Sequence, residues 1–307
     1  MIVIGFDTSN YTTSISYFDG QTGENCSKLL PVKDGQLGLR QSDAVFQHIK
    51  SLPELSDRLF SDIDINSVQA IGVSTRPRDR SDSYMPCFLV GYTHARMLSD
   101  ALHVPLFECS HQQGHIAACA WSAGRMDLLE MPHLAWHLSG GTTELLLVEP
   151  ENKNVKCTII GGTTDISAGQ LIDRTGQMLS LSFPSGKQID ALSCESDCND
   201  FYPVKSENSF FSLSGMQNKL QKYYGSGADR ADTAAYCLRS ICYAIKNATN
   251  QAFDRYPHLP IVFSGGVASN SLLRKELLDI KPIFAQPRFS TDNAMGVAVL
   301  TYLSLGV

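Results

Sequence analysis

Residues 2–20, "IVIGFDTSNYTTSISYFDG", are the stretch from which the fold can be predicted. An apolar run leads into a polar turn, and apolar residues then alternate with polar ones through Ile15 and Tyr17, which predicts a strand, a turn and a second strand. Residues 134–150, "LAWHLSGGTTELLLVEP", repeat this design around a glycine-rich turn. Two similar hairpins, each heading a strand-rich half, predict a duplicated fold of two lobes with a cleft between them.

The rest of the chain alternates between helical and strand patterns. Helical periodicity predicts helices over residues 43–60, 85–101, 110–123, 168–179, 229–255 and 293–304. Short apolar strands such as "QAIGVS" and "PIVFSG" lie between them, which is typical of α/β architecture. We expect an N-terminal lobe over residues 1–107, a C-terminal lobe over 108–290, and a C-terminal helix, 291–307, that packs back on the first lobe. The polar stretch 195–208 is expected to be a loop.

The composition describes an ordinary soluble globular protein of 307 residues, 43% hydrophobic and 18% charged. A net charge of −6 argues against broad electrostatic capture of nucleic acid or of an acidic membrane. "RPRDR", Arg76 to Arg80, is either a local basic patch or a solvated loop. No apolar run reaches the roughly 18 residues of a membrane span, and the N-terminus lacks the basic region of a signal peptide. Nine irregularly spaced cysteines indicate reduced thiols and a cytoplasmic location.

Three turns, two in hairpins and one before a helix, could bind phosphate, and two of them carry a glycine pair, Gly140-Gly141 and Gly265-Gly266. Two adjacent glycines let the backbone approach a ligand closely, and successive N–H groups form an anion-binding nest, although a glycine pair also makes a plain hairpin. In the third turn, "IVFSGGVASNSLLR", the pair Gly265-Gly266 follows a strand, and a helix is expected from Val267 onward. The dipole of such a helix would add to the attraction for an anion. Neither a P-loop nor a dinucleotide-binding fingerprint occurs.

"ECSHQQGHIAACAW", residues 108–121, carries two histidines four residues apart, on one face of the predicted helix. His111 and His115 could therefore bind one metal ion, or be plain surface or core histidines. The protease pattern H-E-x-x-H is absent, because Gln112 stands at the place of its glutamate. His137, in an apolar strand, and Asp292, at the start of the last helix, are candidate further ligands. Their alternatives are a core histidine with a satisfied ring and a helix N-cap.

The order of these motifs, from HxxxH and SGGT to "GGVASNSLLR" and "TDNA", resembles the TsaD family, once called O-sialoglycoprotein endopeptidase (peptidase M22). The resemblance implies the two-lobed actin/sugar-kinase/Hsp70 (ASKHA) fold with a central nucleotide cleft. It also implies the transfer of threonylcarbamoyl from threonylcarbamoyl-AMP to N6 of the tRNA adenosine beside the anticodon. Expected partners are tRNA, a TsaB-like paralogue and an ATPase.

The same resemblance implies a ligand set for one divalent metal, iron or zinc. His111, His115 and Asp292 match the family's metal ligands, and His137 stands where some members have a ligating tyrosine. It also implies an adenine nucleotide, threonylcarbamoyl-AMP or ATP/AMP. The residues expected to bind it are Ser139, Gly140, Gly141, Thr142, Thr143, Asp173, Gly186, Asp190, Gly265, Gly266 and Asn270. Asp173 matches the aspartate on the ribose, and Ser139 to Thr143 match the phosphate turn.

The chain also departs from the family pattern. Tyr11 and Thr12 replace an acidic pair, "STRPRDRSDSYMPCF" replaces a glycine-rich loop, and Gln170 replaces a glutamate. These changes fall on the acceptor side, and no residue is assigned as a general base. Two alternatives therefore stay open: a carbamoyltransferase of another acceptor, similar to HypF, and a non-catalytic nucleotide-binding paralogue.

Overall fold

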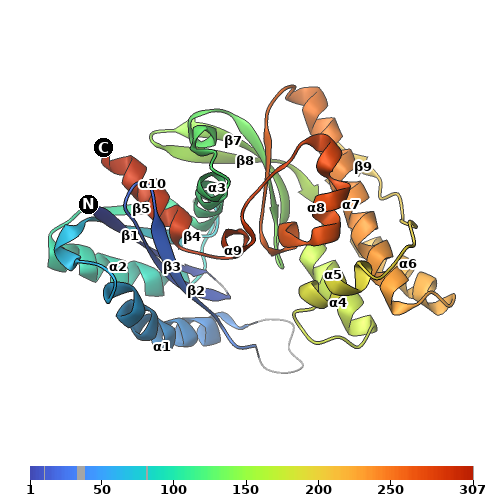
Figure 1. Cartoon of the computed structure of the whole chain (residues 1–307), viewed down its shortest axis with the longest axis horizontal. Coiled ribbons are helices and arrows are strands. Elements are labelled where there is room, and N and C mark those ends of the chain that lie inside the picture. The colour runs from blue at the N-terminus through green and yellow to red at the C-terminus, as the bar shows by residue number, and fades with distance from the viewer. Residues whose placement is uncertain (10, 33–38, 81, 307) are drawn as a thin grey trace. The chain divides into compact units, whose positions relative to one another are not determined.

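The computed structural model describes residues 1–9, 11–32, 39–80 and 82–306 (Figure 1). The chain forms two compact units. The first unit comprises Met1–Met131, Glu149–Cys157 and Asp292–Val307, and the second comprises Pro132–Val148 and Thr158–Thr291. The boundary therefore differs from the expected one at 107/108, because the helix that carries the two histidines packs against the C-terminal helix and lies in the first unit.

The first unit contains a five-stranded sheet of order β3-β2-β1-β4-β5. Its strands are β1 Ile2–Ser9, β2 Thr12–Phe18, β3 Gly23–Leu29, β4 Val68–Arg76 and β5 Leu106–Ser110. β1 pairs antiparallel with β2, which confirms the predicted opening hairpin, and β2 pairs antiparallel with β3. On its other side β1 runs parallel to β4, and β4 runs parallel to β5.

The second unit contains a seven-stranded sheet of order β12-β11-β6-β7-β8-β10-β9. Its strands are β6 His133–Leu138, β7 Thr143–Glu151, β8 Asn154–Thr163, β9 Ser206–Glu207, β10 Phe210–Phe211, β11 Ile261–Ser264 and β12 Ile283–Phe284. The end of β7 and the start of β8, within Glu149–Cys157, are assigned to the first unit. β6 and β7 are antiparallel, as predicted, and β6, β11 and β12 are parallel. The order β8-β7-β6-β11-β12 repeats the order β3-β2-β1-β4-β5 of the first unit, so the predicted duplication is confirmed.

The helices are α1 Gln41–Phe60, α2 Phe88–Leu102, α3 His111–Ser122, α4 Ala168–Met178, α5 Gly186–Ser193, α6 Ser214–Gly225, α7 Arg230–Arg255, α8 Ser271–Glu276, α9 Pro287–Ser290 and α10 Met295–Leu305. Short 3-10 turns cover Ile65–Ser67, Met126–Glu130, Gly266–Ser269 and Leu278–Ile280. The six predicted helices are all present, with ends within three residues of those expected. The helix expected after Gly266 is present as α8, but its expected start at Val267 is wrong, because a 3-10 turn comes first and α8 begins only after Asn270.

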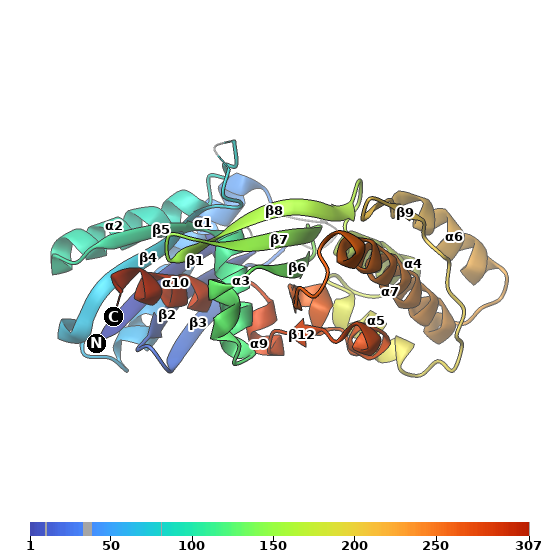
Figure 2. The ribbon, with the colours of Figure 1, turned by 90° about the horizontal axis from the view of Figure 1, so that it is seen from above.

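The two faces of the first sheet are covered by different helices (Figure 2). Ile4 and Phe6 on β1 pack with apolar side chains of α1 and α2, such as Leu55 and Val90. The opposite face is covered by α10, which also packs against α3. A Cβ built on Gly296 of α10 would lie 1.8 Å from the carbonyl oxygen of Gly114 on α3, so these two helices touch backbone to backbone.

The second unit has one large apolar core, which joins β6 and β11 to α4, α5, α6 and α7. Trp136 of β6 is fully buried there, and its indole N–H donates to Thr249 Oγ1 of α7 at 2.8 Å. None of the nine cysteines, all of which lie in the described part of the chain, forms a disulfide. No helix in the described part of the chain is long and apolar enough to cross a bilayer.

Candidate metal and nucleotide site

The position of His111 is fixed by the start of α3. Ser110 ends β5 and is the N-cap of the helix, and Gln113 completes a capping box with it. The Ser110 side chain accepts from the Gln113 backbone N–H at 3.2 Å, and Gln113 Oε1 accepts from the Ser110 backbone N–H at 2.8 Å. This S-x-x-Q pattern is a helix start signal, so His111 is the first residue of the helix and His115 lies one turn later.

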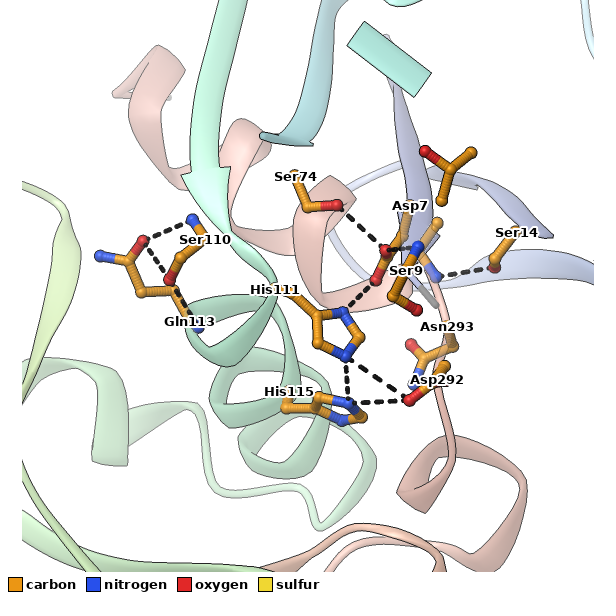
Figure 3. A network of polar contacts seen from close by, with 12 residues as sticks. Asp7, Ser9, Ser14, Ser74, Ser110, His111, Gln113, His115, Asp292 and Asn293 are labelled. Carbon is orange, nitrogen blue, oxygen red and sulfur yellow. Dashed lines mark hydrogen bonds and ion pairs between the residues drawn. The ribbon is translucent and has the colours of Figure 1, made fainter. Parts of the chain in front are cut away.

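Three side chains converge at this end of α3 (Figure 3). The Nε2 atoms of His111 and His115 lie 3.0 Å apart, and Asp292 Oδ1 lies 3.5 Å from the first and 3.3 Å from the second. The side chain of His115 is 2% exposed, that of His111 15% and that of Asp292 25%. Among the described residues, these three form the one group of three or more His, Cys, Asp or Glu residues whose potential metal-ligand atoms all lie within 4.8 Å of one another.

These separations fit a small divalent cation. With metal–ligand bonds of about 2.0–2.1 Å, the donors of a tetrahedral site lie about 3.3 Å apart. Two imidazole nitrogens and one carboxylate oxygen suit zinc or iron. The N-cap alternative for Asp292 is wrong, because α10 begins at Met295 with Ala294 as its N-cap and no side chain caps it. The Asp292 carboxylate instead points at the two histidines.

Asp7 is a further member of this cluster that the sequence did not predict. It lies near the end of β1, is 1% exposed, and places Oδ2 2.6 Å from His111 Nδ1 (Figure 3). Its other oxygen accepts from the Ser9 backbone N–H and from the Ser74 hydroxyl. An acidic residue directly after the apolar run of residues 2–6 was the available signal, since a buried carboxylate needs a partner.

The charges of this cluster are strongly coupled. Burial alone lowers the pKa of His111, but the carboxylates of Asp7 and Asp292 outweigh it and raise that pKa to about 10. Burial and the adjacent His111 lower the pKa of His115. Burial raises the pKa of Asp292, yet hydrogen bonds and charge from the two histidines hold it well below its usual value. The two carboxylates thus favour a positive charge on His111, and a metal ion bound at its Nε2 would have to replace that proton.

His137 belongs to the second unit, on β6. Side chains alternate along a strand, so it points to the face opposite Trp136 and away from the apolar core. It is 7% exposed, and its Nδ1 lies 3.3 Å from the Ser264 hydroxyl of the adjacent β11. The described cluster of potential metal ligands consists of His111, His115 and Asp292, and a role for His137 in binding metal stays a prediction.

The glycine turns lie together in the second unit. The turn Ser139 to Thr142 closes through the Ser139 N–H, which donates to the Thr142 carbonyl, and through the Thr142 N–H, which donates to Ser139 Oγ. Ser167, the N-cap of α4, donates to the Gly140 carbonyl at 2.7 Å, and Thr143 Oγ1 accepts from the N–H of Ala168. The two glycine turns thus follow the neighbouring strands β6 and β11, and the first of them lies beside the start of α4.

Some of these glycines are required by the protein itself, and others are not. Gly265 has φ of +92°, and a Cβ there would lie 2.1 Å from the Leu138 carbonyl oxygen. At Gly140, Gly141 and Gly186 a built Cβ meets no heavy atom of the described residues within 4 Å. Open space beside the backbone is what a ligand that approaches these turns would need.

The other expected nucleotide residues connect the helices of the second unit. Asp173 on α4 accepts from the Ser185 N–H, next to Gly186 at the start of α5, and burial raises its pKa. Asp190 on α5 accepts from both the N–H and the hydroxyl of Ser271. Asn270 accepts from the Leu273 N–H and so caps α8. Each has a structural partner, and nucleotide contact by these residues stays a prediction.

Two departures from the family pattern have structural explanations. Gln170 is the third residue of α4 and forms a capping box with Ser167, a task that glutamine and glutamate perform equally. In the loop after β4, Arg76 pairs with Asp79 and Arg80 with Asp82. The Pro77 carbonyl accepts from the Gln112 N–H at 3.0 Å, so this loop lies against the first turn of α3. These pairings favour the solvated-loop interpretation of "RPRDR" over a basic patch.

Comparison with solved structures identifies the fold. HypF in a phosphate- and nucleotide-bound form superposes with a TM-score of 0.61 at 12% identity, over 99% of this chain and 46% of the HypF chain. Component A of the (R)-2-hydroxyglutaryl-CoA dehydratase from Acidaminococcus fermentans gives 0.58 at 13% identity, with all of both chains covered. The ROK hexokinase of Thermus thermophilus gives 0.51 at 15%, over 99% of this chain and all of its own. The chain has the ASKHA fold.

Comparison of sequences is more specific. A model of the family TsaD, described as tRNA N6-adenosine threonylcarbamoyltransferase, matches residues 37–299. A protein of that name from Thermosipho africanus is 30% identical over 320 residues, with 98% of this chain and 94% of its own length covered. Another from Limosilactobacillus reuteri is 28% identical over 276 residues, with 84% of this chain and 77% of its own length covered. The chain therefore belongs to the TsaD family of tRNA N6-adenosine threonylcarbamoyltransferases.

Proposed function

We propose that this chain transfers a threonylcarbamoyl group from threonylcarbamoyl-AMP to N6 of the tRNA adenosine beside the anticodon, with one divalent metal held by His111, His115 and Asp292. The observation that carries the proposal is the convergence of these three ligand atoms within 4.8 Å in a chain of this family. When bound, the metal supplies Lewis acidity toward an oxygen of the carbamoyl-adenylate.

The nucleotide would bind to the second unit. We propose that the turns at Ser139 to Thr143 and at Gly265-Gly266 present backbone N–H groups to the phosphate, and that Asp173, Gly186, Asp190 and Asn270 hold the nucleoside. Open space at Gly140, Gly141 and Gly186 supports close approach of a ligand. His137 lies on β6, the strand that leads into the turn at Ser139, and it would be a fourth metal ligand or a neighbour of the phosphate.

The reaction balances without a redox partner. The N6 amine attacks the carbamoyl carbon, a new N–C bond forms, the bond from that carbon to the phosphate oxygen breaks, and AMP leaves. N–H donors placed at the phosphate favour departure, because they stabilise the charge that develops on it. The N6 proton passes to a base for which no side chain of this chain is assigned. The proposed setting is the cytoplasm, with a TsaB-like paralogue and an ATPase as partners.

Complementation tests this function. The gene should restore threonylcarbamoyladenosine in tRNA of a strain depleted of its own synthase, measured by mass spectrometry of the nucleosides, with the matching partners supplied. D292A should restore none while the protein accumulates normally. Soluble wild-type protein that restores no modification would contradict the tRNA acceptor, and would favour a HypF-like transfer to another acceptor or a non-catalytic paralogue.

A further inference from the structure

We propose that Asp7 is a positioning residue for the metal site: its carboxylate holds the Nδ1 side of His111, so that Nε2 is directed at His115 and Asp292. The inference rests on the proposed function, because it concerns the same metal. It assigns a role to a residue of the first strand, 104 positions away from the histidine in sequence.

The first argument is the geometry of the ring. Asp7 Oδ2 lies 2.6 Å from Nδ1, while Nε2 of the same imidazole lies 3.0 Å from His115 Nε2 and 3.5 Å from Asp292 Oδ1. Figure 3 shows His111 between the two carboxylates, with one nitrogen toward each. An imidazole that donates its Nδ1 proton to a carboxylate keeps the Nε2 lone pair for a metal, and this contact also fixes the orientation of the ring.

The second argument is that Asp7 is itself held firmly. Its other oxygen, Oδ1, accepts from the Ser9 N–H at 2.9 Å and from the Ser74 hydroxyl at 3.0 Å. Ser74 comes from β4, the parallel neighbour of β1. The carboxylate is therefore fixed by two adjacent strands of the sheet, and it transmits that fixed position to the first residue of α3.

The third argument separates this role from general support of the fold. Thr8, the next residue, is equally buried, and its hydroxyl donates to the Cys87 carbonyl and accepts from the Gly91 N–H at the start of α2. Neighbouring side chains of a strand point to opposite faces, so Thr8 supports the helix on one face while Asp7 meets His111 on the other. Thr8→Val removes buried hydrogen bonds next to Asp7 without touching the histidine, and is the matched control.

The test measures metal affinity on folded protein. Zinc affinity would be obtained by competition with a chromophoric chelator, and cobalt would report the ligand geometry through its visible spectrum. D7N should weaken zinc about 10–100-fold and alter the cobalt spectrum, since loss of an outer-sphere partner of a ligating histidine has effects of this size. T8V should lower the melting temperature and leave zinc affinity and spectrum unchanged. S74A, which removes one support of Asp7, should weaken zinc less than D7N, and it decides the question if D7N does not fold.

Two results would overturn the inference. The first is a zinc affinity and cobalt spectrum in D7N equal to those of the wild type, or the same result in S74A if D7N does not fold. The second is a loss of zinc affinity in T8V as large as that in D7N. H111A and D292A separate this from failure of the metal site. If these two variants bind zinc as tightly as the wild type, the metal site itself is wrong. If they lose zinc while D7N retains it, the inference about Asp7 alone is wrong.

Discussion

At the scale of single residues, two glycines of the second unit differ in why they are glycine. Gly265 has a positive φ and faces the Leu138 carbonyl, whereas Gly141 has open space where a Cβ would be. Backbone strain of this kind costs about 1–3 kcal/mol. We therefore expect G265A to lose about 2 kcal/mol or more of unfolding free energy in urea. G141A should stay within about 0.5 kcal/mol of the wild type and weaken AMP binding measured by calorimetry. Equal stability of the two variants would contradict the structure around Gly265.

His48 on α1 gives a pH dependence of a known sign. Its ring is fully buried, with Nδ1 2.8 Å from the Thr13 hydroxyl, and burial lowers its pKa from 6.5 to about 4, against a raising effect of Asp7. Between those two pH values the unfolded chain binds a proton at this residue and the folded chain does not. Stability contributed by the neutral ring is thus complete above pH 6.5 and falls by about 1.4 kcal/mol per pH unit as the pH drops toward 4.

The measurement compares the wild type with H48Q, which retains polar atoms for Thr13 and does not titrate. From about pH 7 to about pH 5, the wild type should lose about 2 kcal/mol more unfolding free energy than H48Q. The comparison within one pair cancels the titration of all other groups. An equal loss in both proteins would show that His48 is charged in the folded state.

At the scale of elements, two helices, one in each unit, start with the same capping box. Ser110 and Gln113 begin α3, and Ser167 and Gln170 begin α4. Replacing either serine with alanine should cost about 1 kcal/mol of unfolding free energy. S110A should also weaken zinc binding, because the next residue is His111. S167A should leave zinc binding unchanged and weaken AMP binding, since Ser167 also donates to the Gly140 carbonyl. If both variants weaken zinc equally, α3 is not what positions the ligand.

The elements that the sequence predicted are those with a strong local signal. The long helices α1 and α7 have amphipathic periods, and both hairpins have clear alternation around a polar turn. Two elements had weaker signals: α5 spans only eight residues, and α6 is mostly polar on its exposed faces. The segment after Gly266 looked helical because it is apolar, but the Asn270 side chain caps a helix that starts at Ser271. Local sequence indicated the type of structure there and misplaced its start by a turn.

In the candidate metal site, sequence spacing predicted the contact between His111 and His115 but not the contact between Asp7 and His111. His111 and His115 share a helix face by periodicity alone, so their proximity follows from local structure. The contact between Asp7 and His111 depends on β1 and β5 flanking β4, which is a property of the sheet. Asp292 was predicted from the family resemblance, while its own local sequence suggested a cap. Side-chain contacts that depend on the order of strands in a sheet are therefore the part of the site that could not be predicted from this one sequence.

At the scale of the whole molecule, the proposed metal site includes a residue of the C-terminal segment, Asp292–Val307, which belongs to the first unit. Asp292 precedes α10, which reaches α3 through Gly296 and Gly114. G296A would place its Cβ 1.8 Å from a carbonyl oxygen, whereas a Cβ at Gly114 would meet a Val297 methyl at 3.3 Å. We expect G296A to lower both the melting temperature and zinc affinity, and G114A to have a smaller effect on each. Unchanged zinc affinity in a destabilised G296A would show that Asp292 is positioned independently of α10.

Zinc itself should stabilise the protein, since its proposed ligands come from α3 and from the segment before α10. Free zinc at a hundredfold excess over its dissociation constant would add about 2.7 kcal/mol of unfolding free energy, or roughly 4 °C in the melting temperature of a chain of 307 residues. A chelator should remove this shift, and D292A should abolish most of it. D100A, which removes an exposed carboxylate paired with Arg96, is the control and should keep the full shift. A zinc shift of the same size in D292A would show that the stabilising metal binds elsewhere. Zinc raises the melting temperature only by binding the folded protein, so loss of one of its ligands must reduce the shift.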